Sequence, residues 1–248
     1  IRRQRQMCIR DSRKIMDHFT PKLWLGMTAT PDKRDDNVEG RNVYEIFNYQ
    51  IAYEIRLQQA MEESLLCPFH YFGITDLSMI GDEEAARDFN MLTSDERVRH
   101  IVNQADYYGY SGDKVKGLIF CSNIKETEEL SAKFNQIINP ATGKNFRTVA
   151  LNGSASEQER QDAFERLAMN EDESSEDRQP LDYIFSVEIL NEGVDIVEVN
   201  QVIMLRPTQS PIVFIQQLGR GLRKASGKEY VVILDLSLIH ISEPTRPY

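Results

Sequence analysis

The sequence predicts an α/β domain built around a parallel sheet, and two observations carry this prediction. Short apolar runs recur along the chain and are continuous rather than alternating, as in strands that are buried on both faces. Helical stretches lie between these runs, and alternating strands and helices imply right-handed crossovers with parallel pairing. The expected strands are residues 23–27, 117–121, 148–151, 183–186, 201–205 and 230–234.

The starts of three helices are marked in the sequence. Asn123 with Glu126, and Ser156 with Glu159, have the three-residue spacing of a capping box. A third helix is expected from Pro211, because a proline in the first turn of a helix loses no hydrogen bond. Its packing face would be formed by Ile212, Ile215, Leu218 and Leu222.

Composition indicates an ordinary globular protein. The 248 residues are 41% hydrophobic and 27% charged, which suits one or two hydrophobic cores. No apolar run approaches the roughly 18 residues that a membrane span requires, so we expect a cytoplasmic protein. The three cysteines and four histidines lack the spacing of a metal site, and no metal ligands are expected among them.

Net charge at first argues against a nucleic-acid partner. The chain has 29 basic and 39 acidic residues, giving a net charge of −10, whereas phosphate binding normally depends on lysine and arginine. The acidic residues are unevenly distributed, however, because residues 171–177 hold five of them without one base. Such a run is typical of a solvated loop, here between a helix and a strand, and it leaves room for a locally basic or amide-lined groove.

Two arginines lie in the sequence Gln-Gln-Leu-Gly-Arg-Gly-Leu-Arg at residues 216–223. Arg220 and Arg223 are three residues apart, which places them on one face of a helix. A planar guanidinium group suits bidentate contact with phosphate oxygens. The alternative is a solvated helix end, where arginine favours the helix dipole.

Four segments upstream of these arginines complete an ordered series. They are Leu-Trp-Leu-Gly-Met-Thr-Ala-Thr-Pro from residue 23, Leu-Ile-Phe-Cys-Ser-Asn from residue 118, Leu-Asn-Gly-Ser-Ala-Ser from residue 151, and Ser-Val-Glu-Ile-Leu-Asn-Glu-Gly-Val-Asp from residue 186. In order and separation the series resembles motifs III to VI of superfamily 2 helicases. The resemblance is greatest to bacterial helicase-like proteins grouped with type III restriction helicase subunits and XPB-like translocases.

The resemblance implies a RecA-like fold and a division of the chain. Residues 112–235 resemble the second RecA-like domain of the helicase core, and residues 13–75 resemble the C-terminal part of the first. Residues 76–111 would form a helical connection packed through Ala86, Phe89, Val98, Ile101 and Val102. Tyr107, Tyr108 and Tyr110 could either stack on bases or close a helix against the core.

The resemblance also implies a nucleotide site between the two RecA-like domains, holding ATP and Mg²⁺. Arg223 would be the arginine finger and Arg220 a companion phosphate contact. Gln216, Gly193 and Asp195 match family positions near the nucleotide. Helix-end salt bridges for the arginines, and a capped turn for residues 193–195, are the structural alternatives.

A nucleic-acid groove is implied in the same way, with DNA as the expected partner. Hydroxyls, amides and helix N-termini there would hold the phosphate backbone without reading sequence. Thr28 and Thr30 match the motif that couples the two sites, or they could simply hydrogen bond within a buried strand end. For Ser122 and Asn123, helix capping is the alternative. The predicted groove residues are Ser122, Asn123, Gly153, Ser154 and Ser186.

Two motifs of a complete motor do not occur in this sequence. A phosphate-binding loop needs Gly, four residues, then Gly-Lys-Ser or Gly-Lys-Thr, and neither Gly143-Lys144 nor Gly227-Lys228 satisfies this pattern. No Asp-Glu-Ala-His-type metal motif precedes residue 23 either. We therefore expect a fragment of a longer motor, with the nucleotide held mainly by motifs of the first domain.

Both ends of the chain differ in character from the rest. Residues 1–12 and 236–248 contain Met-Cys-Ile-Arg-Asp-Ser and Leu-Ser-Leu-Ile-His-Ile-Ser-Glu-Pro-Thr-Arg, which look like a translated transposase-type sequencing adapter. We expect these ends to be non-native and set them aside from the fold. A frayed basic leader and an ordinary polar tail are the alternative.

Three functions compete at this point. The first is an ATP-dependent helicase or translocase of which this chain forms the C-terminal part of the motor. The second is the helicase subunit of a restriction or defence system, with a nuclease domain or subunit as partner. The third is a RecA-like module that binds nucleic acid or a partner without hydrolysis, which would have no need of Arg220 and Arg223.

The absence of a phosphate-binding loop and a metal-binding acid yields a first prediction. The purified 248-residue chain should not turn over ATP, because nothing in it matches the groups that hold the phosphates and magnesium. Phosphate release in the presence of Mg²⁺ and DNA measures this. DNA-stimulated release that survives rigorous purification would contradict the expectation.

Overall fold

The computed structural model describes residues 16–27, 44, 47–55, 57–74, 92–187, 196–206 and 222–236. The chain divides into two compact units, Ile1–Arg56 and Leu57–Tyr248. The ordered sheet, and the residues from which a site can be built, belong to the second unit.

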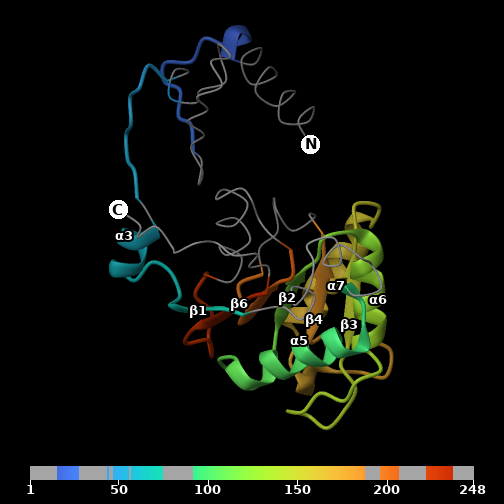
Figure 1. Cartoon of the computed structure of the whole chain (residues 1–248). Coiled ribbons are helices and arrows are strands. Elements are labelled where there is room, and N and C mark those ends of the chain that lie inside the picture. The colour runs from blue at the N-terminus through green and yellow to red at the C-terminus, as the bar shows by residue number, and fades with distance from the viewer. Residues whose placement is uncertain are drawn as a thin grey trace, which may run out of the picture. The chain divides into compact units, whose positions relative to one another are not determined.

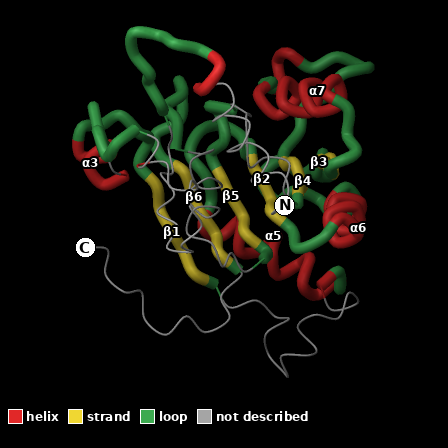
Figure 2. The backbone as a smooth tube through the Cα atoms, turned by 90° about the horizontal axis from the view of Figure 1, so that it is seen from above, coloured by secondary structure: helices red, strands yellow, loops and turns green. Residues whose placement is uncertain are grey.

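The described residues of the second unit form a six-stranded sheet in the order β1-β6-β5-β2-β4-β3. All five neighbouring pairs are parallel, and Figures 1 and 2 show the strands side by side. This confirms the predicted parallel α/β class. The strands are β1 (Phe69–Gly73), β2 (Gly117–Phe120), β3 (Thr148–Leu151), β4 (Tyr183–Ser186), β5 (Gln201–Met204) and β6 (Val231–Asp235).

Helices cover both faces of this sheet. Side chains alternate along each strand, so neighbouring residues of one strand face opposite cores. Ile119 of β2 packs in one core with residues of α5 and α6, and Leu118 packs in a second core with residues of α7. The sheet is therefore buried on both faces, as its continuous apolar runs require. The helical elements are α3 (Leu57–Glu62), α5 (Asp95–Tyr108), α6 (Ile124–Phe134), α7 (Glu157–Ala168) and the 3₁₀ turn η3 (Glu171–Glu173).

The central strands lie where the sequence predicts them. Strands β3 and β4 have the predicted bounds, β2 and β5 end one residue earlier than predicted, and β6 is shifted by one residue at both ends. Of the two predicted capping boxes, the one between Ser156 and Glu159 is complete. In the other, the Asn123 side chain caps α6, but the Glu126 carboxylate accepts the N–H of Ser122 instead.

Residues 23–27 do not form the buried strand that the sequence predicts. They have no regular secondary structure, and Leu23, Leu25 and Met27 are exposed. A strand is buried only when neighbours pair with it and helices cover it. None of the described residues of the first unit pairs with this segment, so its apolar pattern does not lead to a strand here.

The boundary between the two units also differs from the prediction. Strand β1 lies within residues 13–75, which we interpreted as part of a first RecA-like domain, yet it pairs with β6 from Phe69↔Val231 to Gly73↔Asp235. The boundary follows Arg56 instead. The sequence pattern missed β1 because only Phe69 and Phe72 of this strand are partly buried, so it lacks a continuous apolar run.

Helix α5, which packs on the sheet, lies within residues 76–111, the predicted helical connection. Val98, Ile101 and Val102 are buried in the core, as expected, whereas Ala86 and Phe89 lie outside the described residues. The tyrosines at the end of this helix and just after it divide into two kinds. Tyr108 stacks on Phe72 with ring centroids 4.1 Å apart and Tyr110 packs against the core, which favours the structural alternative for both, while Tyr107 is exposed.

The predicted non-native ends lie almost wholly outside the described residues. The exception is Leu236, the first residue of the predicted tail, which is buried in the core. Its N–H donates to the carbonyl oxygen of Met204 at 2.9 Å. Leu236 therefore belongs to the folded domain. Among the described residues, no helix combines the length and apolar character needed to cross a bilayer.

The close approach of β2 to β4 generates a prediction for Gly117. A Cβ atom at this position would overlap the ring of Tyr183. That ring is buried and fixed, because the Tyr183 hydroxyl donates to Gln201 Oε1 at 2.6 Å. Gly117→Ala should therefore lower the free energy of unfolding by about 1–3 kcal/mol, as overpacked cores do. Urea unfolding measures the loss.

Gly153→Ala is the matched control for this prediction. Nothing lies within 4 Å of the position that its Cβ would occupy, so the free energy of unfolding should change by less than about 0.5 kcal/mol. Equal effects of the two substitutions would contradict the packing argument.

Candidate functional site

The carboxyl ends of the parallel strands share one edge of the sheet, which is where ligands bind in folds of this class. Ser122 and Asn123 follow β2, Gly153 and Ser154 follow β3, and Ser186 is the last residue of β4. In the register of the sheet, Ser186 lies opposite Phe120 of β2 and Leu151 of β3. The structure thus brings all five predicted groove residues to this edge, which we call the carboxyl edge.

The loop after β2 is held rigidly at the carboxyl edge. The Cys121 N–H donates to the carbonyl oxygen of Ser186 at 2.9 Å, and the Ser122 N–H donates to Glu126 Oε2 at 2.7 Å. Asn123 Oδ1 accepts the N–H of Glu126 at 2.9 Å. The capping alternative therefore holds for Asn123, whereas Ser122 is exposed and does not cap the helix.

Helix α6 begins directly behind this loop. The N-terminus of a helix carries partial positive charge and presents backbone N–H groups that favour anions. Backbone N–H groups at this helix start and the Ser122 hydroxyl are therefore the groups of the β2 loop that could contact a phosphate.

The loop after β3 forms a second, more open part of the carboxyl edge. Asn152 Oδ1 accepts hydrogen bonds from the Ser154 N–H at 3.0 Å and from its hydroxyl at 2.5 Å. Gly153 is exposed, with no atom within 4 Å of the space that a Cβ would fill. The backbone at Gly153 is therefore accessible, while the Ser154 hydroxyl is already used within its own turn.

Ser186 differs from the other groove residues because it is completely buried. Its hydroxyl has no hydrogen-bond partner among the described residues, and its carbonyl oxygen is taken by Cys121. The structure therefore places Ser186 at the carboxyl edge but does not expose it as the other four residues are exposed.

Arg223 lies apart from the carboxyl edge. It is exposed and follows Leu222, whose carbonyl oxygen accepts the N–H of Cys67 at 2.7 Å just before β1 begins. Arg223 is therefore near the amino ends of the strands. The other residues predicted for the nucleotide site and for coupling lie outside the described residues: Arg220, Gln216, Gly193, Asp195, Thr28 and Thr30.

Sequence reasoning missed one feature of the carboxyl edge, a buried ion pair. Arg97 of α5 lies 2.8 Å from Glu126 of α6, and the two side chains are 1% and 0% exposed. Glu126 is the residue that holds the Ser122 N–H. The spacing from Asn123 signalled Glu126 only as a capping residue. Arg97 lies four residues before Ile101, on the packing face of α5, and this spacing is the signal that could have found it.

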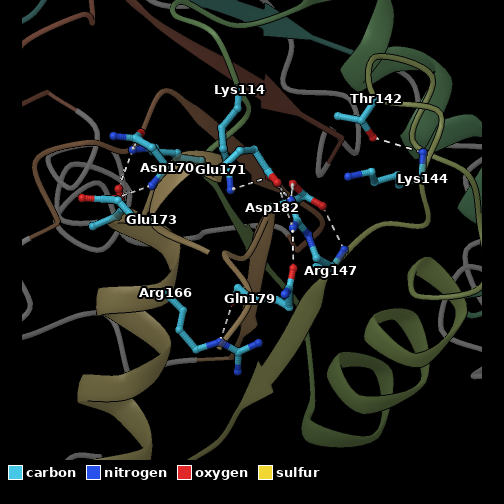
Figure 3. A network of polar contacts seen from close by, with 12 residues as sticks. Lys114, Thr142, Lys144, Arg147, Arg166, Asn170, Glu171, Glu173, Gln179 and Asp182 are labelled. Carbon is cyan, nitrogen blue, oxygen red and sulfur yellow. Dashed lines mark hydrogen bonds and ion pairs between the residues drawn. The ribbon is translucent and has the colours of Figure 1, made fainter. Parts of the chain in front are cut away.

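A polar network occupies the opposite, amino edge of the sheet (Figure 3). Asp182, just before β4, accepts the N–H of Arg147 at 2.8 Å, and the Arg147 side chain pairs with Glu171. Glu171 begins the acidic loop, which is exposed as predicted. The network therefore anchors the start of the acidic run far along the strands from Ser122 and Gly153.

Lys114 lies within this network and is nearly enclosed. Its side chain is 10% exposed, and its Nζ atom is 3.9 Å from Glu171 Oε1. Burial lowers the pKa of Lys114 to about 8, because desolvation of the ammonium outweighs the attraction of Asp182 and Glu171. Burial likewise raises the pKa of Asp182.

Comparison with known proteins defines the class of this fold. Residues 96–225 match the family described as the helicase conserved C-terminal domain, a span of more than half of the chain. The fold also resembles a structure described as a fragment of the HsdR subunit of a type I restriction enzyme from Vibrio vulnificus YJ016, with a TM-score of 0.67 and 22% identity over 90% of this chain and 41% of that one. The chain belongs to the helicase conserved C-terminal family, and its sheet is the RecA-like fold of superfamily 2 helicases.

Two further matches show how much of a relative this chain spans. A Methanocaldococcus jannaschii protein described as an ATP-dependent RNA helicase is 29% identical over 178 residues, which are 64% of this chain and 21% of that protein. The restriction-modification enzyme LlaBIII, solved bound to DNA, has a TM-score of 0.52 and 20% identity over 77% of this chain and 13% of that one. The chain thus spans about a fifth of the curated relative.

The low pKa of Lys114 generates a prediction about stability and pH. Below pH 8 the folded protein must carry a buried charge, and between pH 8 and 10.5 the folded lysine loses its proton while the unfolded one keeps it. The free energy of unfolding of the wild type therefore rises with pH through that window, because the penalty of the buried charge is relieved. Lys114→Met should be more stable than the wild type at pH 7, and this advantage should shrink toward pH 10.

Urea unfolding of both proteins from pH 6 to 10 measures the difference. Between pH 6 and 7 the advantage of Lys114→Met should be constant, because Lys114 is protonated in both states there. A variant that is less stable than the wild type at pH 7, or an advantage independent of pH up to 10, would contradict the burial argument.

Proposed function

We propose that this chain forms the C-terminal part of the motor of an ATP-dependent nucleic-acid helicase or translocase. The observation that carries the proposal is the carboxyl edge of a helicase C-terminal domain, where the Ser122 loop, the start of α6 and the open backbone at Gly153 lie together. These groups offer hydrogen-bond donors and accessible backbone on an open surface rather than an enclosed pocket. They suit a repeating phosphate backbone better than a single small ligand.

DNA is the nucleic acid that we favour. The fold likeness to a restriction-modification enzyme solved on DNA agrees with the sequence resemblance, although the M. jannaschii relative is described as acting on RNA. No base-reading side chains are required, because Ser122, Asn123, Gly153 and Ser154 would contact phosphates and sugars. Ser186 would take part only if its buried hydroxyl were uncovered on binding.

The nucleotide would bind on a different face of the domain from the nucleic acid. Arg223 is exposed near the amino ends of the strands, away from the carboxyl edge, so one domain could serve two ligands at once. In this proposal Arg223 stabilises the charge of the transferring phosphoryl group, and Arg220 makes a companion phosphate contact. Gln216, Gly193 and Asp195 would lie near the nucleotide.

Magnesium would bind with the phosphates and neutralise the charge that develops on them. The residues that hold it would belong to the first domain of the motor. Thr28 and Thr30 would couple the nucleotide site to the nucleic-acid groove, so that each cycle of domain closure moves the protein along the strand.

A second candidate is the helicase subunit of a restriction or defence system. The observation that favours it is the fold likeness to the type I and LlaBIII restriction enzymes. This candidate differs from the first only in its partner, a nuclease domain or subunit. DNA cleavage by the full-length protein with its neighbouring gene products, dependent on ATP, would distinguish the two.

The proposed finger generates a prediction for the full-length protein. Arg223→Ala should lower kcat for nucleic-acid-stimulated ATP hydrolysis by about 10³-fold, as loss of other arginine fingers does, with much less effect on ATP affinity. Arg223→Lys should stay near the alanine value, because an ammonium cannot reproduce the planar guanidinium. Steady-state ATPase assays and melting temperatures measure both effects.

Arg178→Ala is the control, since Arg178 is an exposed arginine paired with Asp162 and Glu165 on α7. Its turnover should equal that of the wild type. Near-normal turnover by Arg223→Ala, or a loss explained wholly by unfolding, would return Arg223 to the role of a helix-end arginine.

A further inference from the structure

The ion pair between Arg97 and Glu126 is unusual in being completely buried. Arg97 Nη1 lies 2.8 Å from Glu126 Oε1, with the side chains 1% and 0% exposed. Removing two charges from water costs so much that a buried pair often stabilises a protein no better than apolar side chains of similar size. Stability alone is therefore a weak reason for this pair, and its neighbours suggest another.

Each partner of the pair holds a piece of backbone. The second carboxylate oxygen of Glu126 accepts the Ser122 N–H at 2.7 Å. The guanidinium group of Arg97 also donates to the carbonyl oxygen of Leu92 at 2.5 Å. The pair thus ties the loop after β2 to the chain that leads into α5, at the carboxyl edge of the sheet.

Arg97 also compensates the charge of Glu126. An uncompensated carboxylate at Glu126 would lie in the first turn of α6, beside the backbone N–H groups that favour an anion, and would repel a phosphate there. The guanidinium group cancels that charge. Glu126 can therefore hold the Ser122 loop without its charge repelling the phosphates of a nucleic acid.

We propose that Arg97 and Glu126 are positioning residues for nucleic-acid binding. Glu126 fixes the shape of the Ser122–Asn123 loop, and Arg97 fixes and neutralises Glu126, so that the loop is ordered before the nucleic acid arrives. This inference rests on the proposed function and deepens it. Neither residue touches the nucleic acid, and both act through the loop.

The test replaces the pair by apolar residues of similar size. In the Arg97→Met and Glu126→Leu double variant the core should stay filled, so the melting temperature should remain near that of the wild type. The Ser122 N–H loses its acceptor, and the loop must then be ordered on binding. Binding of a labelled single-stranded oligothymidylate should become about tenfold weaker, and hydrogen exchange at Ser122 should become faster without oligonucleotide.

A second ion pair between the same two helices gives the matched control. Lys133 of α6 lies 2.7 Å from Asp95 of α5 at the surface and does not contact the Ser122 loop. Asp95→Asn and Lys133→Met should leave oligonucleotide affinity and Ser122 exchange unchanged. A purely structural link between α5 and α6 would instead make these variants resemble the buried double variant.

Glu126→Gln covers the case in which the double variant does not fold. The glutamine has nearly the same shape but one acceptor oxygen for two donors, so it should weaken binding and Ser122 protection in the same direction. A folded double variant, or a folded Glu126→Gln, with wild-type affinity and wild-type exchange would overturn the inference. A wild-type protein that fails to bind the oligonucleotide would overturn the proposed function itself.

Discussion

Parallel pairing of β4 between β2 and β3 is the constraint on which the rest of this structure depends. Because all three strands point the same way, Phe120, Ser186 and Leu151 end in one row. The loops after β2 and β3 therefore meet at the carboxyl edge, although a helix and a long loop separate them in sequence. Without this register the Ser122 and Gly153 loops could not form one surface.

The two edges of the sheet have different electrostatic characters. At the amino edge, Glu171 of the acidic loop pairs with Arg147 beside Asp182, and Lys114 is desolvated nearby. At the carboxyl edge, the carboxylate of Glu126 is neutralised by Arg97. The acidic run at residues 171–177 is therefore anchored away from the proposed groove.

The carboxyl edge is ordered by contacts inside the protein rather than by a ligand. Asn123 caps α6, Glu126 holds Ser122, and Asn152 holds Ser154. Preordered loops lose less conformational entropy on binding, which would favour the nucleic-acid contact proposed for them.

The sequence by itself determined the central strands, the fold class and the Ser156–Glu159 capping box, because each depends on neighbouring residues or on burial of both faces. The edge strand β1 and the exposed residues 23–27 needed the tertiary structure, because whether an apolar segment pairs depends on which strands lie beside it. The clearest case is Glu126. Its spacing from Asn123 is that of a capping box, but its carboxylate pairs with Arg97 instead. Arg97 is close to Glu126 only because α5 packs beside α6.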